Sequence, residues 1–189
     1  MAELSPDGGA MIEALRAAVP RPELADRLAL FGRFVGSWDV ERTGHAADGT
    51  SFTVPGEWHW GWVLDGRAIQ DVFICPARPL RTEPVPPPGE WGTVLRFFDP
   101  AIDAWRATWI SPVTGLVHRF VAREVGDEIV LSGATDDGHP LRWIFSDIAA
   151  DSFRWRSEES ADGGQTWRTT VTMRMRRKPV AGGDAPAGS

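Results

Sequence analysis

The chain has no tyrosine and a single cysteine among its 189 residues. One cysteine excludes an internal disulfide and any zinc site made of cysteines alone. Cys75 lies in the apolar run 72–75, where a small buried side chain is its expected role. The missing tyrosine also excludes the phenolic nucleophile on which sialidases depend.

Long apolar runs and basic stripes are missing as well. No stretch approaches the roughly 20 apolar residues that span a bilayer, and the first residues lack the basic and apolar regions of a secretion signal. The formal net charge is -6, because 20 Lys and Arg are scattered among 26 Asp and Glu. We therefore expect a cytoplasmic protein that binds neither membranes nor nucleic acid.

Histidine is scarce and widely spaced, at positions 45, 59, 118 and 139. No two histidines have the spacing that places a pair of metal ligands on one face of a strand or a helix. The phosphate loops, dinucleotide fingerprints and nucleophile elbows of common enzymes are also absent from the sequence. We expect no metal and no cofactor.

Tryptophan, in contrast, is abundant, with ten residues. Trp58, Trp60 and Trp62 alternate with Glu57 and His59, which places the three indoles on one face of a strand. An indole row that faced water would be an aggregation hazard, so this face is expected either to line a cavity or to pack as core.

The apolar pattern divides the chain into three segments. Residues 1–35 are helical in pattern: 11–19 have helical composition up to Pro20, and apolar residues at three- and four-residue spacing predict a second helix from Pro22. Residues 36–178 are rich in strands. The tail 179–189 consists mainly of Gly, Ala, Pro and Asp, and we expect it to be disordered.

Period-two alternation begins after Gly36. It predicts about nine or ten strands, at 37–43, 52–64, 67–75, 93–98, 105–110, 116–125, 128–135, 141–148, 153–159 and 167–176. Asp65-Gly66 indicates a tight turn with positive φ at both positions. A proline-rich loop is expected at 76–89. So many strands with short connections should curl, and we predict a mainly β fold: a single antiparallel meander barrel with two short N-terminal helices.

Gly36-Ser37-Trp38 at the start of the first strand, behind a short helix, and Arg174 and Arg176 on the last strand resemble the calycin pattern of lipocalins and fatty-acid-binding proteins. The resemblance implies that Trp38 plugs one barrel end beneath an arginine of the final strand. Residues 30–177 are similar to an uncharacterised bacterial family of lipocalin-like barrels. The related nitrobindin barrels hold haem through a late histidine, and since no histidine follows His139, haem is disfavoured.

Residues 160–167, Ser-Ala-Asp-Gly-Gly-Gln-Thr-Trp, match the Asp-box of sialidase propellers. In a propeller the box recurs in each blade, whereas here it occurs once. We interpret it as a hairpin signal in which Asp162 binds local amides and Trp167 covers the turn.

The candidate ligand is a small hydrophobic or aromatic molecule, held by Trp58, Trp60, Trp62, Trp105, Trp109 and Trp143, with Arg96 or Arg142 turned inward to bind a carboxylate or phenolate. Alternatively, the barrel is a cofactor-independent isomerase or cyclase in which His118 or Glu57 moves a proton. A third interpretation is that the tryptophans are all core, in a structural or oligomeric module. A homodimer stays open at this point.

Overall fold

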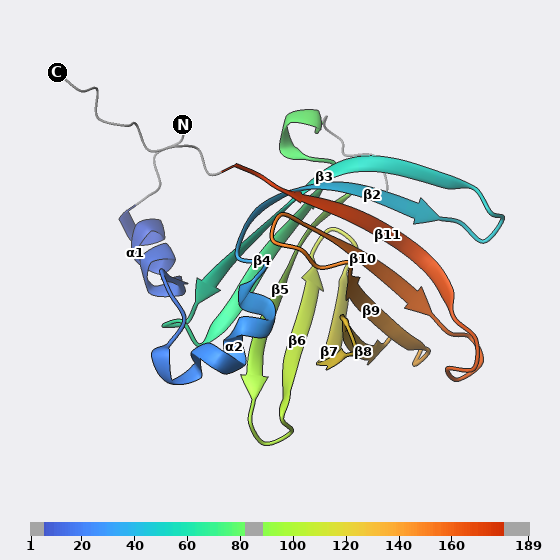
Figure 1. Ribbon diagram of the computed structural model, residues 1–189. Coiled ribbons are helices and arrows are strands. Elements are labelled where there is room, and N and C mark those ends of the chain that lie inside the picture. Colours follow the sequence, from blue (N-terminus) through green and yellow to red (C-terminus); the bar gives the residue numbers. More distant parts are fainter. Residues whose placement is uncertain (1–5, 82–88, 180–189) are drawn as a thin grey trace.

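The protein is an antiparallel β-barrel in the computed structural model, which describes residues 6–81 and 89–179 (Figure 1). Its wall consists of β2 (Gly36–His45), β3 (Ser51–Val63), β4 (Ala68–Cys75), β5 (Glu90–Asp99), β6 (Ala104–Ser111), β7 (Leu116–Val125), β8 (Glu128–Ala134), β9 (Pro140–Ser146), β10 (Ser152–Glu159) and β11 (Arg168–Arg177). Each strand pairs with the next in sequence, and β11 pairs with β2 to close the ring. The predicted meander barrel is confirmed.

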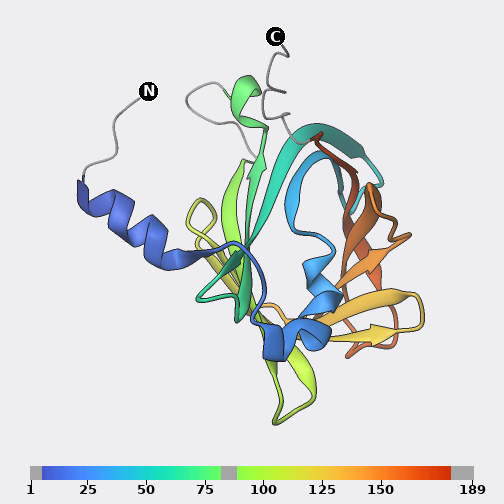
Figure 2. The same cartoon turned by 60° about the vertical axis from the view of Figure 1, so that its left-hand side comes forward.

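The N-terminal segment differs in detail from the prediction. Helix α1 (Pro6–Leu15) ends before residue 19, because the chain then forms a short strand, β1 (Arg16–Ala17), which pairs with β3. A single 3-10 turn, η1 (Pro22–Leu24), leads into α2 (Ala25–Gly32). Figure 2 shows α1 projecting from the barrel while α2 lies against one end of it.

The connections follow the turn signals. At the predicted turn, Asp65 and Gly66 have φ of 58° and 70°, and the Leu64 carbonyl accepts a hydrogen bond from the Arg67 N–H at 3.1 Å. A 3-10 turn, η2 (Arg78–Leu80), occupies part of the proline-rich segment. The rest of that predicted loop, 82–88, and residues 180–189 of the predicted tail lie outside the described residues.

Aromatic side chains fill the barrel end covered by α2, which we call the helix end. Leu28 and Phe31 on α2, and Phe34 just after it, are buried. The Phe34 ring lies 5.1 Å from that of Phe145 and 4.6 Å from that of Phe153. Burial of each such ring is worth roughly 1.5–3 kcal/mol, so this packing fixes α2 on the barrel.

Trp38 lies at the helix end beneath an arginine of the last strand, as the calycin resemblance implies. The guanidinium carbon of Arg177 is 4.1 Å from the centre of the Trp38 ring. The indole Nε1 donates to the Phe34 carbonyl at 2.8 Å. Arg174 and Arg176 are not the partners, because both are exposed on the outward positions of β11.

Arg177 also fastens the end of α2 to the barrel. Its two terminal nitrogens donate to the carbonyls of Arg33 and Val35 at 2.7 and 2.8 Å. Its Nε donates to the Ala150 carbonyl at 2.8 Å. One side chain thereby joins β11, the β9–β10 connection and the chain that leaves α2.

Candidate ligand-binding site

A cavity of about 170 Å³ occupies the barrel interior away from α2. We call this the loop end, because the β2–β3, β6–β7 and β10–β11 connections lie there. The cavity is lined by Trp58, Trp109, Trp143 and Trp155, by Arg42, Glu90 and His118, and by aliphatic side chains. Drug-sized ligands occupy about 300–1,000 Å³, whereas a cavity of about 150 Å³ binds benzene. The space therefore suits one or two aromatic rings.

The indoles brace one another around the cavity. The Trp143 ring makes edge contacts with Trp109 at 5.9 Å and with Trp155 at 5.3 Å. Trp109 also packs closely against Gly92 of β5, where an added Cβ would be only 2.2 Å from the Trp109 ring. Gly92 thus leaves room for the Trp109 ring. Packing on Gly92 and Trp143 fixes this ring in place without a ligand.

Polar donors face this cavity without partners. Nε1 of Trp155, Nδ1 of His118 and Nη1 of Arg42 are buried and have no hydrogen-bond partner within residues 6–81 and 89–179, whereas the Trp58 indole is directed at Asp71, whose pKa its hydrogen bonding lowers. A buried donor without a hydrogen-bond partner costs about 1–3 kcal/mol of stability. The cavity is therefore apolar in its walls and rich in hydrogen-bond donors.

Two carboxylates complete the lining. The Ser111 hydroxyl donates to Glu90 at 2.8 Å, and burial raises the pKa of the Glu90 carboxyl. Glu159 is partly exposed at the mouth and pairs with Arg168 at 3.8 Å. Acidic oxygens are thus present, but both carboxylates have contacts of their own.

The structure brings together four of the residues singled out from the sequence: Trp58, Trp109, Trp143 and His118 all line the cavity. The three other predicted tryptophans lie toward the helix end. Trp105 contacts Phe31 at 4.9 Å, and the Trp62 ring lies against Gly32 of α2.

Trp60 is covered by Arg96, whose guanidinium carbon lies 4.2 Å from the ring centre. Arg96 points inward, as proposed from its apolar neighbours, but it forms an ion pair with Asp71, and both side chains are 0% exposed. Burial raises the pKa of Asp71 and lowers that of Arg96, and each charge opposes the shift of the other. The guanidinium group of Arg96 is therefore paired with a protein carboxylate rather than open to a ligand.

Arg142 and Glu57 lie on the outer face of the barrel. Arg142 pairs with Glu158, and its guanidinium carbon lies 3.9 Å from the Trp167 ring centre. Glu57 accepts a hydrogen bond from Arg78 Nε at 2.7 Å and forms a second hydrogen bond with His59 Nε2. These bonds, above all that from Arg78, lower the pKa of Glu57 to about 2, so it is an ionised structural carboxylate.

The Asp-box forms the predicted turn between β10 and β11. Asp162 accepts hydrogen bonds from the N–H groups of Gln165 and Thr166 at 2.9 and 2.8 Å. Trp167 Nε1 donates to the Gly164 carbonyl at 3.1 Å. Hydrogen bonds from Thr166 hold the pKa of Asp162 below its usual range. The motif stabilises the hairpin turn through local hydrogen bonds, as interpreted from the sequence.

Sequence reasoning missed Arg42 and Trp155 as cavity residues. Arg42 follows Trp38 and Val40 at two-residue spacing, and Trp155 follows Phe153 in the same way. Alternation along the strand was therefore the available signal. Arg42 was overlooked because its immediate neighbours in sequence are polar.

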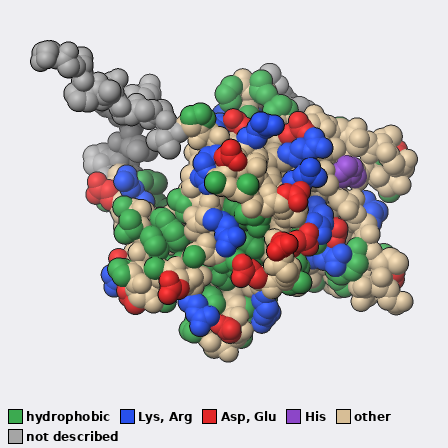
Figure 3. All heavy atoms as spheres, viewed as in Figure 1, with side chains coloured by type: hydrophobic (Ala, Val, Ile, Leu, Met, Phe, Trp, Pro, Cys, Tyr) green, Lys and Arg blue, Asp and Glu red, His purple; other side chains and the backbone are tan. Residues whose placement is uncertain are grey.

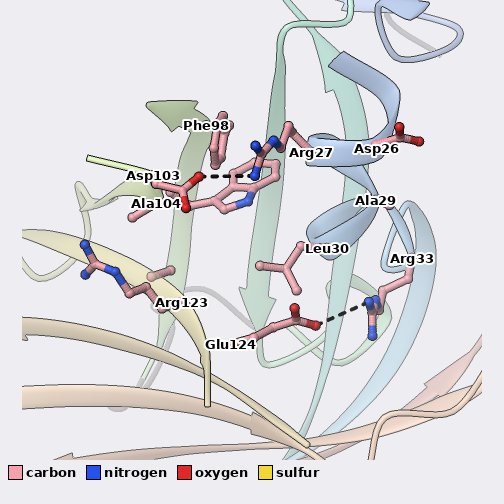
Figure 4. Close-up of a pocket in the computed structure, with 12 residues that line it drawn as sticks. Asp26, Arg27, Ala29, Leu30, Arg33, Phe98, Asp103, Ala104, Arg123 and Glu124 are labelled. Carbon is pink, nitrogen blue, oxygen red and sulfur yellow. Dashed lines mark hydrogen bonds and ion pairs between the residues drawn. The ribbon is translucent and has the colours of Figure 1, made fainter. Parts of the chain in front are cut away.

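A second hollow, of about 390 Å³, lies between α2 and strands β5 to β7 (Figure 4). Arg27 pairs there with Asp103 at 3.1 Å, and Arg33 with Glu124 at 3.8 Å. All four side chains are exposed, and surface pairs of this kind contribute only about 0–1 kcal/mol. The charged side chains of this hollow are all exposed, whereas the barrel cavity is lined by buried indoles, which makes the barrel cavity the better candidate.

Acidic and basic side chains are interspersed over the molecular face drawn in Figure 3. Within residues 6–81 and 89–179, no group of three or more His, Cys, Asp or Glu is arranged to hold a metal ion. In the same part of the chain, no helix has the length and apolar character needed to cross a bilayer. Cys75 is fully buried, and burial raises the pKa of its thiol to about 11.

Two solved structures share the fold. The S-type phycobiliprotein lyase CPES from Guillardia theta is 15% identical, with a TM-score of 0.53 over 80% of this chain and 92% of the lyase. Rv2717c from M. tuberculosis is 14% identical, with a TM-score of 0.53 over 85% of this chain and 99% of its own. No family model and no curated protein matches the sequence. At this level of identity the likeness extends to the barrel fold alone.

Proposed function

We propose that this protein binds a small, flat, largely apolar molecule in the cavity at the loop end. The observation that carries the proposal is the indole wall of Trp58, Trp109, Trp143 and Trp155 around about 170 Å³, with buried polar groups that have no partner in the described part of the chain. Rigid aromatic walls give a flat ligand large contact area at little entropic cost.

The likeness to CPES supports the barrel that holds this cavity, and the indoles support the ligand class. The contact of Trp38 with Arg177 supports membership of the lipocalin-like calycin barrels, which we propose on that basis. A cytoplasmic location is likewise our proposal, from composition.

Titration with 2-naphthamide, a neutral two-ring probe, tests the function by isothermal titration calorimetry. We expect saturable binding at one site. Trp143→Ala should weaken binding by about 1–3 kcal/mol, the value of stacking on one aromatic side chain. Trp91→Ala is the matched control, because Trp91 is 45% exposed and does not line the cavity. Absence of binding at millimolar probe would overturn the function.

Proton transfer on a molecule held in the same cavity is the second candidate function, and His118 favours it. The imidazole lines the cavity with Nδ1 unpartnered, whereas Glu57 lies outside. On any substrate found in an isomerase screen, His118→Gln should then lower turnover by about 10²–10⁴-fold. Glu57→Gln should change it less than about tenfold. A small effect of His118→Gln would leave binding as the function.

A further inference from the structure

Arg42 is a buried charge that forms no ion pair with the described residues, although its charge partly offsets the rise that burial causes in the pKa of Glu90, which lines the same cavity. The Arg42 side chain belongs to a residue only 9% exposed, and it forms no ion pair or hydrogen bond within residues 6–81 and 89–179. Its nearest aromatic contact is the Phe52 ring, 5.9 Å from the guanidinium carbon. Burying an unpaired charge costs several kcal/mol, about as much as breaking a buried ion pair.

The strand explains why Arg42 lies inside. β2 alternates, so Trp38, Val40 and Arg42 all face the barrel interior, and Arg42 lines the cavity. The other interior arginine, Arg96, has Asp71 as its counter-charge. Of these two inward guanidinium groups, only the one at the cavity lacks a direct ion pair within the described residues.

The geometry points to a ligand carboxylate as the partner of Arg42: we propose that the cavity selects small aromatic carboxylates over their neutral analogues. This inference rests on the proposed function. The indole donor of Trp155 also has no acceptor within the described residues, and a carboxylate oxygen supplies one. Its planar shape matches the fork of a guanidinium group.

The other charges at the cavity limit the ligand to one negative charge. Glu90 lines the same cavity and makes no ion pair in the described part of the chain. Glu159 lies at the mouth with Arg168, and His118 faces the interior. The cavity offers one guanidinium without an ion pair in the described residues, so the second charge of a dianion such as a phosphate monoester would be buried without a counter-charge. A monocarboxylate on one or two rings meets both the charge and the volume of about 170 Å³.

Calorimetry with 2-naphthoate and 2-naphthamide tests the inference, since the two probes have the same rings and differ in charge. Wild type should bind the carboxylate about 10–100-fold more tightly, the value of a charge-assisted hydrogen bond. Arg42→Gln should reduce that ratio to about one. Arg42→Lys keeps the positive charge but loses the two parallel donors of the guanidinium group. Its ratio of naphthoate to naphthamide affinity should therefore lie between those of wild type and Arg42→Gln.

Two controls separate a local from a general charge effect. Arg174→Gln removes one positive charge from the outer face of β11, where Arg174 is 70% exposed and pairs with Glu41, and it should leave the ratio unchanged. Glu90→Gln removes the opposing charge and should raise the ratio of naphthoate to naphthamide affinity. Near-UV circular dichroism confirms the fold of each variant.

The outcomes distinguish the two proposals. Failure of both probes to bind overturns the proposed function. Equal binding of both probes to wild type keeps the function and overturns carboxylate selection. A preference for naphthoate that survives in Arg42→Gln also overturns the inference, because the carboxylate would then be held elsewhere.

Discussion

At the helix end of the barrel, aromatic rings fill the interior, whereas at the loop end similar rings surround a cavity. Trp38, at the helix end, donates its indole N–H to the Phe34 carbonyl. Trp155, at the cavity, has no such acceptor in the described residues, and neither has Trp60 toward the helix end, which lies under Arg96 and not beside the cavity. Abundant tryptophan therefore does not by itself mark a binding site. Unpartnered donors beside open volume do.

The two inward arginines repeat this contrast. Arg96 forms an ion pair with Asp71, while Arg42 lines the cavity without an ion pair to any described residue. Changes near the helix end should thus alter stability and spare binding, and changes at the loop end should do the reverse.

The largest effect is expected from the buried ion pair. Asp71→Asn should lower the free energy of unfolding by about 3–5 kcal/mol, because it leaves Arg96 buried without a counter-charge. Replacing both partners, Asp71→Leu with Arg96→Met, should recover most of that loss. Urea denaturation measures both. Equal losses in the single and double variants would mean that the charges are not coupled.

Matched truncations at the two ends sharpen the comparison next. Phe31→Ala should cost about 3–5 kcal/mol of unfolding free energy, since the ring is fully buried. Trp143→Ala should cost only about 1–2 kcal/mol, because it enlarges a cavity that already exists. Affinity for 2-naphthamide should fall in Trp143→Ala and hold in Phe31→Ala. The opposite pattern would break the division between the two ends.

A smaller, pH-dependent effect is expected from Glu57. Its pKa is about 2 in the folded protein against an ordinary 4.5. A lowered pKa stabilises the fold above pH 4.5, and this contribution is lost as the pH falls toward 2. Glu57→Gln should therefore flatten the dependence of the urea midpoint on pH between these values. An unchanged slope in the variant would contradict the assignment.

The smallest effect is expected from Arg142, the candidate that lies outside the barrel. Arg142→Gln should change the free energy of unfolding by no more than about 1 kcal/mol, because the partly exposed pair with Glu158 is screened by water. Binding of 2-naphthoate should not change. A loss of binding in this variant would place the carboxylate site on the outer face.

The strand pattern made the barrel predictable, because period-two alternation and turn residues are local properties. The turn at Asp65-Gly66 and the Asp-box hairpin were readable for the same reason. The end of α1 was not, because β1 is formed by pairing with a strand that lies over 40 residues further along the chain.

Side-chain partners were harder to predict than faces. That Arg96 turns inward follows from its apolar neighbours, but its pairing with Asp71 depends on the register between β4 and β5. The opposite orientations of Trp58 and Glu57 were readable from alternation. The sequence did not reveal which indoles border open space, because that depends on how far α2 fills the barrel.

The hydrogen bonds by which Arg177 fastens the end of α2, which we call the Arg177 clamp, also have a consequence for synthesis of the chain. The Arg177 side chain and the Val35 carbonyl that it binds are 142 positions apart. At about 5–20 residues per second, a ribosome needs about 7–28 s to add that stretch. During this time the apolar face of α2 has neither its clamp nor a complete barrel to cover it. Chains that stop short of residue 177 should therefore keep that face open to chaperones and proteases.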